Sequence, residues 1–157
     1  MQHSFEPVYN EYSNVLILGT FPSIKSREQN FFYGNPQNRF WKVISAVTNT
    51  PLPITIEEKK AMLLAHNIAI WDVIYSCEIT GSSDSSIKNV VPMDFSNVLK
   101  QSSITHIYAN GATAAKLYQK YCEATTNIPI IPLPSTSPAN AAFSLEKLIL
   151  AWRIVNV

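Results

Sequence analysis

The segment at residues 19–38 concentrates side chains that bind planar ligands. It holds three consecutive aromatic residues, Phe31, Phe32 and Tyr33, among several amides and two cations, Lys25 and Arg27. Aromatic rings interleaved with amides and cations are typical of a site that stacks a nucleobase or a sugar. The alternative is that the rings cover the core while the amides form turns, and both interpretations stay open at this point.

A second segment, at residues 133–140, has the composition of an anion-binding site. Ser135, Thr136 and Ser137 place small hydroxyl groups between an apolar run and a helical pattern. Hydroxyls and free backbone N–H groups at the start of a helix can hold a phosphate. An ordinary capped turn uses the same residue types, so this segment also has two interpretations.

Two acidic residues lie where they can take part in chemistry. Asp84 is flanked by serines in residues 81–86, where it can orient a water, hold a phosphate-binding side chain or simply serve as a solvated turn residue. Asp72 interrupts an apolar run beside Trp71. Because a buried carboxylate needs a partner, we expect Asp72 to cap a neighbouring backbone group.

The sequence predicts neither a metal site nor a cofactor. His3, His66 and His106 have no mutual spacing typical of metal ligands, so structural or exposed positions are expected for them. Cys77 and Cys122 are too few for a four-cysteine zinc site or an iron–sulfur cluster, and we expect buried thiols in a reducing cytosol. A glycine-rich phosphate loop and a Gly-x-Ser-x-Gly elbow are both absent.

Alternating apolar runs and helical patterns predict an α/β fold. Continuous apolar runs are typical of strands buried on both faces of a parallel sheet. Thr55 with Glu58 has the pattern of a capping box, and Asp94 is the expected N-cap of the next helix. The expected strands are residues 15–18, 68–74, 104–108 and 129–133, and the expected helices are residues 38–47, 56–66, 95–100, 112–122 and 142–154. The alternation predicts a three-layer αβα sandwich around a central, mainly parallel four-stranded sheet.

This fold class also predicts which segments meet. In such sheets ligands bind at the carboxyl ends of the strands. The segments that follow the expected strands are residues 19–38, 75–92, 110–111 and 134–140. Residues 19–38 are expected to form a long functional loop without secondary structure.

Composition narrows the class of protein. The chain of 157 residues is 46% hydrophobic and 15% charged with a net charge of +1, and we expect one domain over residues 1–157. No run approaches the ~18 apolar residues of a membrane span, and no secretory signal is recognisable, so a cytoplasmic or nucleoid-associated location is expected. Since the pI is near 7.8, a nucleic-acid-binding function requires the basic residues to gather on one face.

Three motifs together resemble the uracil-DNA glycosylase superfamily. The segment Gly19-Thr-Phe-Pro-Ser23 follows the first expected strand, and Tyr33-Gly-Asn-Pro-Gln-Asn-Arg-Phe-Trp-Lys-Val-Ile44 is similar to the mismatch-specific branch. The segment Pro134-Ser-Thr-Ser-Pro138 resembles the DNA-inserting Pro-Ser loop of the superfamily. The resemblance spans about residues 15–150 and implies the superfamily's fold.

Within the superfamily the chain looks most like the DNA-deoxyinosine (hypoxanthine-DNA) glycosylase branch. That branch carries a Gly-x-x-Pro motif without the usual acid or amide, a Trp-Asp-Val strand and a Gly-Ser-x-Asp-Ser loop, which are matched by residues 71–73 and 81–85. The uracil branches have a water-activating Asp or Asn where this chain has Phe21, and a His or Asn where it has Leu133. The resemblance therefore implies excision of hypoxanthine, with uracil or mismatched bases as further candidates.

The resemblance also implies roles for individual residues. A deaminated base is flipped out of single-stranded or double-stranded DNA into the pocket, where Tyr33 stacks on it. The important amide of the branch maps to Asn38, which would orient the water or donate to the leaving base. The backbone N–H groups of Thr20 and Phe21 would assist, and Asp84 is an alternative catalytic group. Gly19, Phe21 and Asn110 complete the implied base site.

The implied DNA contacts lie around that pocket. Ser135 and Thr136 would bind phosphates, Ser137 and Pro138 occupy the place of the minor-groove wedge, and Asn140 follows them. Lys25, Arg27, Arg39 and Lys42 are candidate backbone contacts, and a solvated first helical turn is the alternative for Arg39 and Lys42. No lysine is singled out as a Schiff-base nucleophile, so a monofunctional, monomeric enzyme without lyase activity is expected.

Two other hypotheses fit the same residues. The lack of a carboxylate in the first motif would suit a non-catalytic nucleic-acid binder on this fold. The near-neutral charge would suit a hydrolase or binder of free nucleosides that uses the same pocket.

Overall fold

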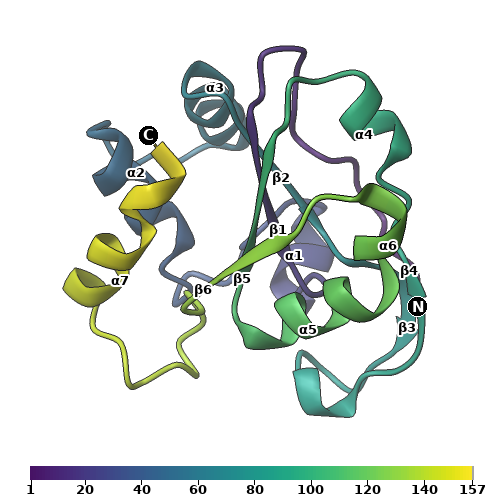
Figure 1. The fold of residues 1–157 in the computed structure, drawn as a ribbon. Coiled ribbons are helices and arrows are strands. Elements are labelled where there is room, and N and C mark those ends of the chain that lie inside the picture. Colours follow the sequence, from purple (N-terminus) through teal and green to yellow (C-terminus); the bar gives the residue numbers. More distant parts are fainter. Residues whose placement is uncertain (157) are drawn as a thin grey trace.

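The centre of the molecule is a parallel sheet of four strands. The computed structural model describes residues 1–156. The strands are β1 (Val15–Gly19), β2 (Ile68–Asp72), β5 (His106–Asn110) and β6 (Ile130–Leu133), arranged in the order β2-β1-β5-β6 (Figure 1). Every neighbouring pair runs parallel, and all five residues of β1 are buried. This confirms the fold class predicted from the apolar runs.

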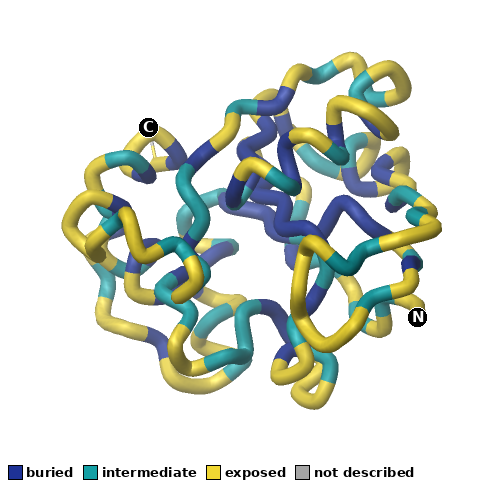
Figure 2. Tube along the Cα trace, turned by 90° about the horizontal axis from the view of Figure 1, so that it is seen from below, coloured by how far each residue is buried: buried dark blue, intermediate teal, exposed yellow. Residues whose placement is uncertain are grey.

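Helices cover both faces of this sheet. Ile17 faces a cluster that contains residues of α2 (Phe40–Thr48), α3 (Ile56–Ala65) and α7 (Leu145–Trp152). Leu16 and Leu18 face a second cluster, with residues of α4 (Ser96–Lys100) and α5 (Ala112–Tyr121), which α6 (Glu123–Thr126) follows. Successive side chains of a strand point to opposite faces, so one apolar run serves both layers. Figure 2 shows the buried segments of the chain gathered in the interior, with exposed segments around them.

The expected strand at residues 68–74 is wrong in its extent. β2 ends at Asp72, and β3 (Ile74–Glu78) begins a separate antiparallel pair with β4 (Lys88–Pro92). The chain turns away because the N–H of Val73 donates to the carbonyl of Gly19 and that of Ile74 to the carbonyl of Thr20. These two bonds tie the start of the hairpin to the end of β1.

The expectation that residues 19–38 lack secondary structure is also wrong. They contain α1 (Ile24–Gln29), whose N-cap Ser23 accepts a hydrogen bond from the N–H of Ser26. Asn30 ends the helix with a left-handed backbone, φ 53°. A polar cap followed by six helical residues is too short for a clear apolar period, so the local pattern did not predict it.

The remaining elements follow the prediction with shifted ends. The capping box of Thr55 and Glu58 is present. Phe95, rather than Asp94, is the N-cap of α4, and the Asp94 carboxylate accepts from the N–H of Ser96 instead. α2 begins after residue 38, and α7 is shorter than predicted and runs into η2 (Arg153–Asn156). Within residues 1–156, no helix has the length and apolar character needed to cross a membrane.

Candidate active site at the carboxyl end of the sheet

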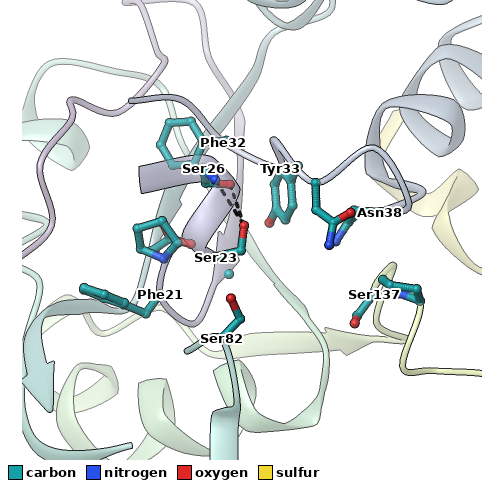
Figure 3. A pocket seen from close by; sticks show the side chains of 13 residues that line it. Phe21, Ser23, Ser26, Phe32, Tyr33, Asn38, Ser82 and Ser137 are labelled. Atoms are coloured by element: carbon teal, nitrogen blue, oxygen red, sulfur yellow. Dashed lines mark hydrogen bonds between the residues drawn. The ribbon is translucent and has the colours of Figure 1, made fainter. Parts of the chain in front are cut away.

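A cavity of about 160 Å³ opens where β1 and β2 end. Gly19 and Asp72, the last residues of these strands, form part of its wall. The rest comes from residues 21–38, from Ser82 in the β3–β4 loop and from Ser137 and Pro138 (Figure 3). The volume is smaller than the ~300–1,000 Å³ of sites for drug-sized ligands, so it suits one flat base.

The aromatic wall of the cavity is held rigidly. Tyr33 stacks on the fully buried Phe40, with ring centroids 4.0 Å apart and planes 16° apart. Tyr33 also has a left-handed backbone, φ 52°, which is unusual for a bulky residue and clusters at functional sites. Its hydroxyl is buried and has no hydrogen-bond partner in the described chain. Burial, and then the charge of Asp72, raises the pKa of Tyr33, and the nearby Asn110 side chain offsets only part of this shift, so the hydroxyl stays neutral.

Asn38 presents a hydrogen-bond donor to the cavity. Its Oδ1 accepts from the N–H of Phe40 at 2.9 Å and from the hydroxyl of Thr136 at 2.8 Å. Because the Phe40 N–H can only donate, the oxygen of the amide must face it, which fixes the orientation of the side chain. The Nδ2 group is therefore the end of the amide that faces the cavity (Figure 3).

Thr136 connects Asn38 to the sheet. Its hydroxyl accepts from Asn110 Nδ2 at 2.9 Å, and its N–H donates to Asn110 Oδ1 at 3.0 Å. Asn110 is the last residue of β5, so the strand end, the loop at residues 134–140 and Asn38 form one hydrogen-bonded chain. The structure thus places Thr136 in the interior, fully buried, and Asn110 supports the loop at residues 134–140.

Arg39 holds the same loop from the other side. Its guanidinium donates to the carbonyls of Ser137 at 2.9 Å, of Asn140 at 3.1 Å and of Phe143. Asn140 closes the turn internally, because its Nδ2 donates to the carbonyl of Ser135 at 3.0 Å. The loop that carries Ser137 and Pro138 is therefore preorganised by side chains from two distant parts of the chain.

A buried hydrogen-bonded pair, Asp72 and His3, lies at the inner end of the cavity. Asp72 is 4% exposed, and its Oδ2 lies 2.7 Å from Nε2 of His3. The sequence indicated that this carboxylate needs a partner, but the expected backbone cap is wrong, because His3 fills that role. The N-terminal segment brings His3 there by pairing with β3, with a bond from the His3 N–H to the Tyr75 carbonyl.

Comparison with known proteins identifies the family. The model of the uracil DNA glycosylase superfamily matches residues 6–155. The chain belongs to the uracil DNA glycosylase superfamily. It is accordingly a DNA glycosylase, an enzyme class that hydrolyses N-glycosidic bonds in DNA, as the sequence motifs predicted.

Named relatives cover most of the chain. A hypoxanthine DNA glycosylase of Methanosarcina acetivorans is 34% identical over 149 residues, which are 94% of this chain and 93% of that protein. A hypoxanthine DNA glycosylase of Methanosarcina barkeri is 30% identical over 89 residues, 56% of each chain. A Methanosarcina acetivorans protein solved by solution NMR superposes with a TM-score of 0.80 at 29% identity, over 98% of this chain and 97% of that one.

The structure brings together about half of the residues expected to form the glycosylase site. Those on the cavity wall are Gly19, Phe21, Tyr33, Asn38, Ser137 and Pro138. Those outside it, among the described residues, are Thr20, Lys25, Arg39, Asp84, Asn110, Ser135, Thr136 and Asn140. The first set forms a continuous wall, and five of the second set, Arg39, Asn110, Ser135, Thr136 and Asn140, bond within or onto the loop at residues 134–140.

The other three expected glycosylase residues lie in different surroundings. Thr20 is buried and uses its carbonyl to bind the N–H of Ile74. Lys25 is exposed on α1, and its Nζ lies 3.7 Å from Oε2 of Glu28. Asp84 begins the short helix η1 (Asp84–Ser86) on the exposed β3–β4 loop, where partial desolvation and then the charge of Asp72 raise its pKa. The same loop contributes Ser82 to the cavity.

Sequence reasoning missed several residues that line the cavity, Ser82 among them, and also missed His3, which contacts Asp72 behind the wall. Ser82 was passed over as one serine among several in a polar turn. The absence of metal-ligand spacing among the histidines predicts only a structural or exposed position for His3, and gives no partner for it. The charged residue inside the apolar run at residues 68–74 was the available signal, because Asp72 required a partner that the sequence alone did not name.

Proposed function

We propose that this chain excises hypoxanthine from DNA by hydrolysing the N-glycosidic bond of a flipped deoxyinosine. The observation that carries the proposal is the cavity at the ends of β1 and β2, which combines aromatic walls with the fixed amide donor of Asn38. The relative named a hypoxanthine DNA glycosylase, which aligns over 94% of the chain, supports the choice of base.

The proposed reaction begins with base flipping. The nucleotide leaves the stack and its base enters the cavity between Phe21 and the wall formed by Tyr33. Both rings line the cavity, and the hydroxyl of Tyr33 is buried. Where the rings exclude water, they strengthen the hydrogen bonds that the base then forms.

Bond cleavage in this proposal is strongly dissociative. As the bond from the sugar lengthens, the sugar gains oxocarbenium character and the base takes up negative charge. Water then adds to C1′ of the sugar to give an abasic site, and the proton that the water loses neutralises the departing base. The Nδ2 group of Asn38 donates to the leaving base or holds the attacking water, and the backbone N–H of Phe21, which lines the cavity, assists. An amide does not titrate usefully, so Asn38 acts by position rather than as a base. A positioned donor of this kind is worth about 2.7–4 kcal/mol.

The loop at residues 134–140 serves the DNA in this proposal. Ser137 and Pro138 lie on the cavity rim and are placed to fill the gap that the flipped nucleotide leaves. Ser135 is held by its bond from the Ser137 N–H at 3.1 Å and lies next to the sharp turn at Gly111, φ 100°. Because the guanidinium of Arg39 is engaged by the carbonyls of this loop, we expect exposed cations such as Lys25 and Lys42 to contact the phosphates.

Single-turnover excision tests the proposal. Labelled duplexes that contain deoxyinosine, deoxyuridine or a G·T mismatch are incubated with the parent and with Asn38→Ala, then treated with alkali to cleave abasic sites. We expect excision of hypoxanthine to fall by about 10²–10³-fold in Asn38→Ala. DNA binding without excision of any base by the parent would instead favour the non-catalytic hypothesis.

A further inference from the structure

The inner wall of the cavity carries an oriented carboxylate that the reaction as proposed does not use. Asp72 lines the cavity at the end of β2, and the side chains of Asp72 and His3 are 6% and 1% exposed. His3 Nε2 lies 2.7 Å from Oδ2, so it satisfies one oxygen of the carboxylate. A buried carboxylate with only one of its oxygens engaged is an acceptor without a complete set of donors.

The other oxygen, Oδ1, lies beside the cavity wall at Gly19. A Cβ atom added to Gly19 would come within 2.5 Å of Asp72 Oδ1 and 3.0 Å of the Tyr33 hydroxyl. The glycine is therefore required for these two oxygens to approach the wall. The Tyr33 hydroxyl is buried without a partner in the described structure, so an unused donor and an acceptor flank the same glycine.

An acceptor beside a donor matches one particular edge of a nucleobase. Hypoxanthine carries a ring N–H next to a carbonyl, and uracil carries the same pair. Adenine carries an unprotonated ring nitrogen next to an amine, which reverses the pattern. A carboxylate accepts a charge-assisted hydrogen bond from the ring N–H of the deaminated base but faces the lone pair of adenine. A site built in this way discriminates strongly, because the wrong base leaves buried polar groups unpaired.

We propose that Asp72, held in place by His3, is the specificity-determining residue that accepts a hydrogen bond from the ring N–H of the deaminated base. His3 is a positioning residue, because it contacts the carboxylate and not the base. The Tyr33 hydroxyl donates to the adjacent carbonyl of the base, so Tyr33 contacts the base through its hydroxyl edge and not through the stacked face that the resemblance implies. This inference rests on the proposed excision of hypoxanthine and names the group that selects it.

The first test measures recognition apart from chemistry. Duplexes that contain the slowly hydrolysed 2′-fluoro-arabino forms of deoxyinosine or deoxyadenosine are titrated with the parent and with Asp72→Asn. We expect the preference of the parent for inosine over adenosine to fall by about 10- to 100-fold in Asp72→Asn. Glu57→Gln, which removes an exposed carboxylate on α3, is the matched control and keeps the preference.

The positioning role of His3 has its own readout. His3→Ala leaves the carboxylate without its donor, and we expect a loss of preference similar to that of Asp72→Asn. His3→Gln supplies a donor of the same kind, and we expect it to recover part of the preference. If neither variant changes the ratio of the two affinities, then His3 only stabilises the fold.

A substrate analogue keeps the proposal testable even if Asp72→Asn does not fold. The parent enzyme is given a duplex with 1-methylhypoxanthine, which lacks the ring N–H but keeps the carbonyl. We expect its single-turnover excision to be at least about tenfold slower than that of hypoxanthine. Equal rates, or an unchanged preference in a folded Asp72→Asn, overturn the assignment of Asp72. Failure of the parent to excise hypoxanthine at all would instead overturn the proposed function.

Discussion

At the scale of single residues, two side chains of the cavity wall, Asn38 and Tyr33, have polar atoms that the protein leaves available to a ligand. Asn38 has its oxygen occupied twice, which turns its nitrogen toward the cavity. Tyr33 has a hydroxyl with no partner among residues 1–156 and a backbone angle that bulky residues avoid. The unpartnered hydroxyl and the left-handed backbone of Tyr33 cost stability in the free protein, and a ligand that accepts from the hydroxyl offsets the first of these costs.

The Tyr33→Phe variant separates the effect of the Tyr33 hydroxyl on stability from its effect on excision. The substitution removes the unpartnered hydroxyl and keeps the ring against Phe40, so we expect the free energy of unfolding to rise by about 1–2 kcal/mol. Excision of hypoxanthine should fall about tenfold because the donor to the base carbonyl is lost. Thermal unfolding and single-turnover rates measure the two effects. Tyr12→Phe, at a side chain that is 66% exposed, is the control. Unchanged excision would mean that Tyr33 contributes only its ring.

At the scale of elements, hydrogen bonds from Arg39 and Asn110 hold the loop at residues 134–140 in place. The guanidinium spans from the start of α2 to three carbonyls about a hundred positions later in the chain. The amide of Asn110 fastens the same loop to the end of β5. The loop is therefore ordered in the free protein, with Ser137 and Pro138 already on the rim of the cavity.

Arg39→Met tests whether this arginine acts on the loop or on DNA. Loss of the guanidinium releases the carbonyls of Ser137 and Asn140, so we expect faster hydrogen exchange at residues 137–143. The enzyme concentration for half-maximal single-turnover rate should rise about tenfold. Arg153→Met, at an exposed position in η2, is the control. Unchanged exchange together with a weaker salt dependence of binding would assign Arg39 to a phosphate contact, as the sequence predicted.

The elements also show what local patterns can predict. The runs at residues 15–18 and 129–133 are strands because they are continuous and apolar, and that property is local. The break after Asp72 depends on bonds to Gly19 and Thr20, residues that are far away in the chain. In β3, Ile74 and Cys77 are buried while Tyr75 and Glu78 are exposed, and five residues without strict alternation give no clear local signal for a strand. No signal in the sequence predicted the pairing of His3 with Asp72, because this pairing depends on how the N-terminal segment packs against the hairpin of β3 and β4.

At the scale of the whole molecule, charge governs how DNA is held. The chain has 12 lysines and arginines against 11 acidic residues, so no strong overall field attracts DNA. Binding must depend on a few local cations near the cavity, and one of these, Lys25, is exposed on α1. Each phosphate contact contributes about 0.9 to the slope of log affinity against log salt, so we expect a shallow slope.

Lys25→Gln should lower that slope by about one for every sequence tested, because a phosphate contact carries no base information. Its preference for inosine over adenosine should not change, since that preference belongs to the inner wall of the cavity. Lys116→Gln, an exposed lysine on α5 outside the cavity wall, should leave both quantities unchanged. Titrations of one labelled duplex at several salt concentrations provide the slopes. Equal slopes for Lys25→Gln and the parent would mean that the DNA does not contact α1. The proposed direction from which the flipped base enters the cavity would then be wrong.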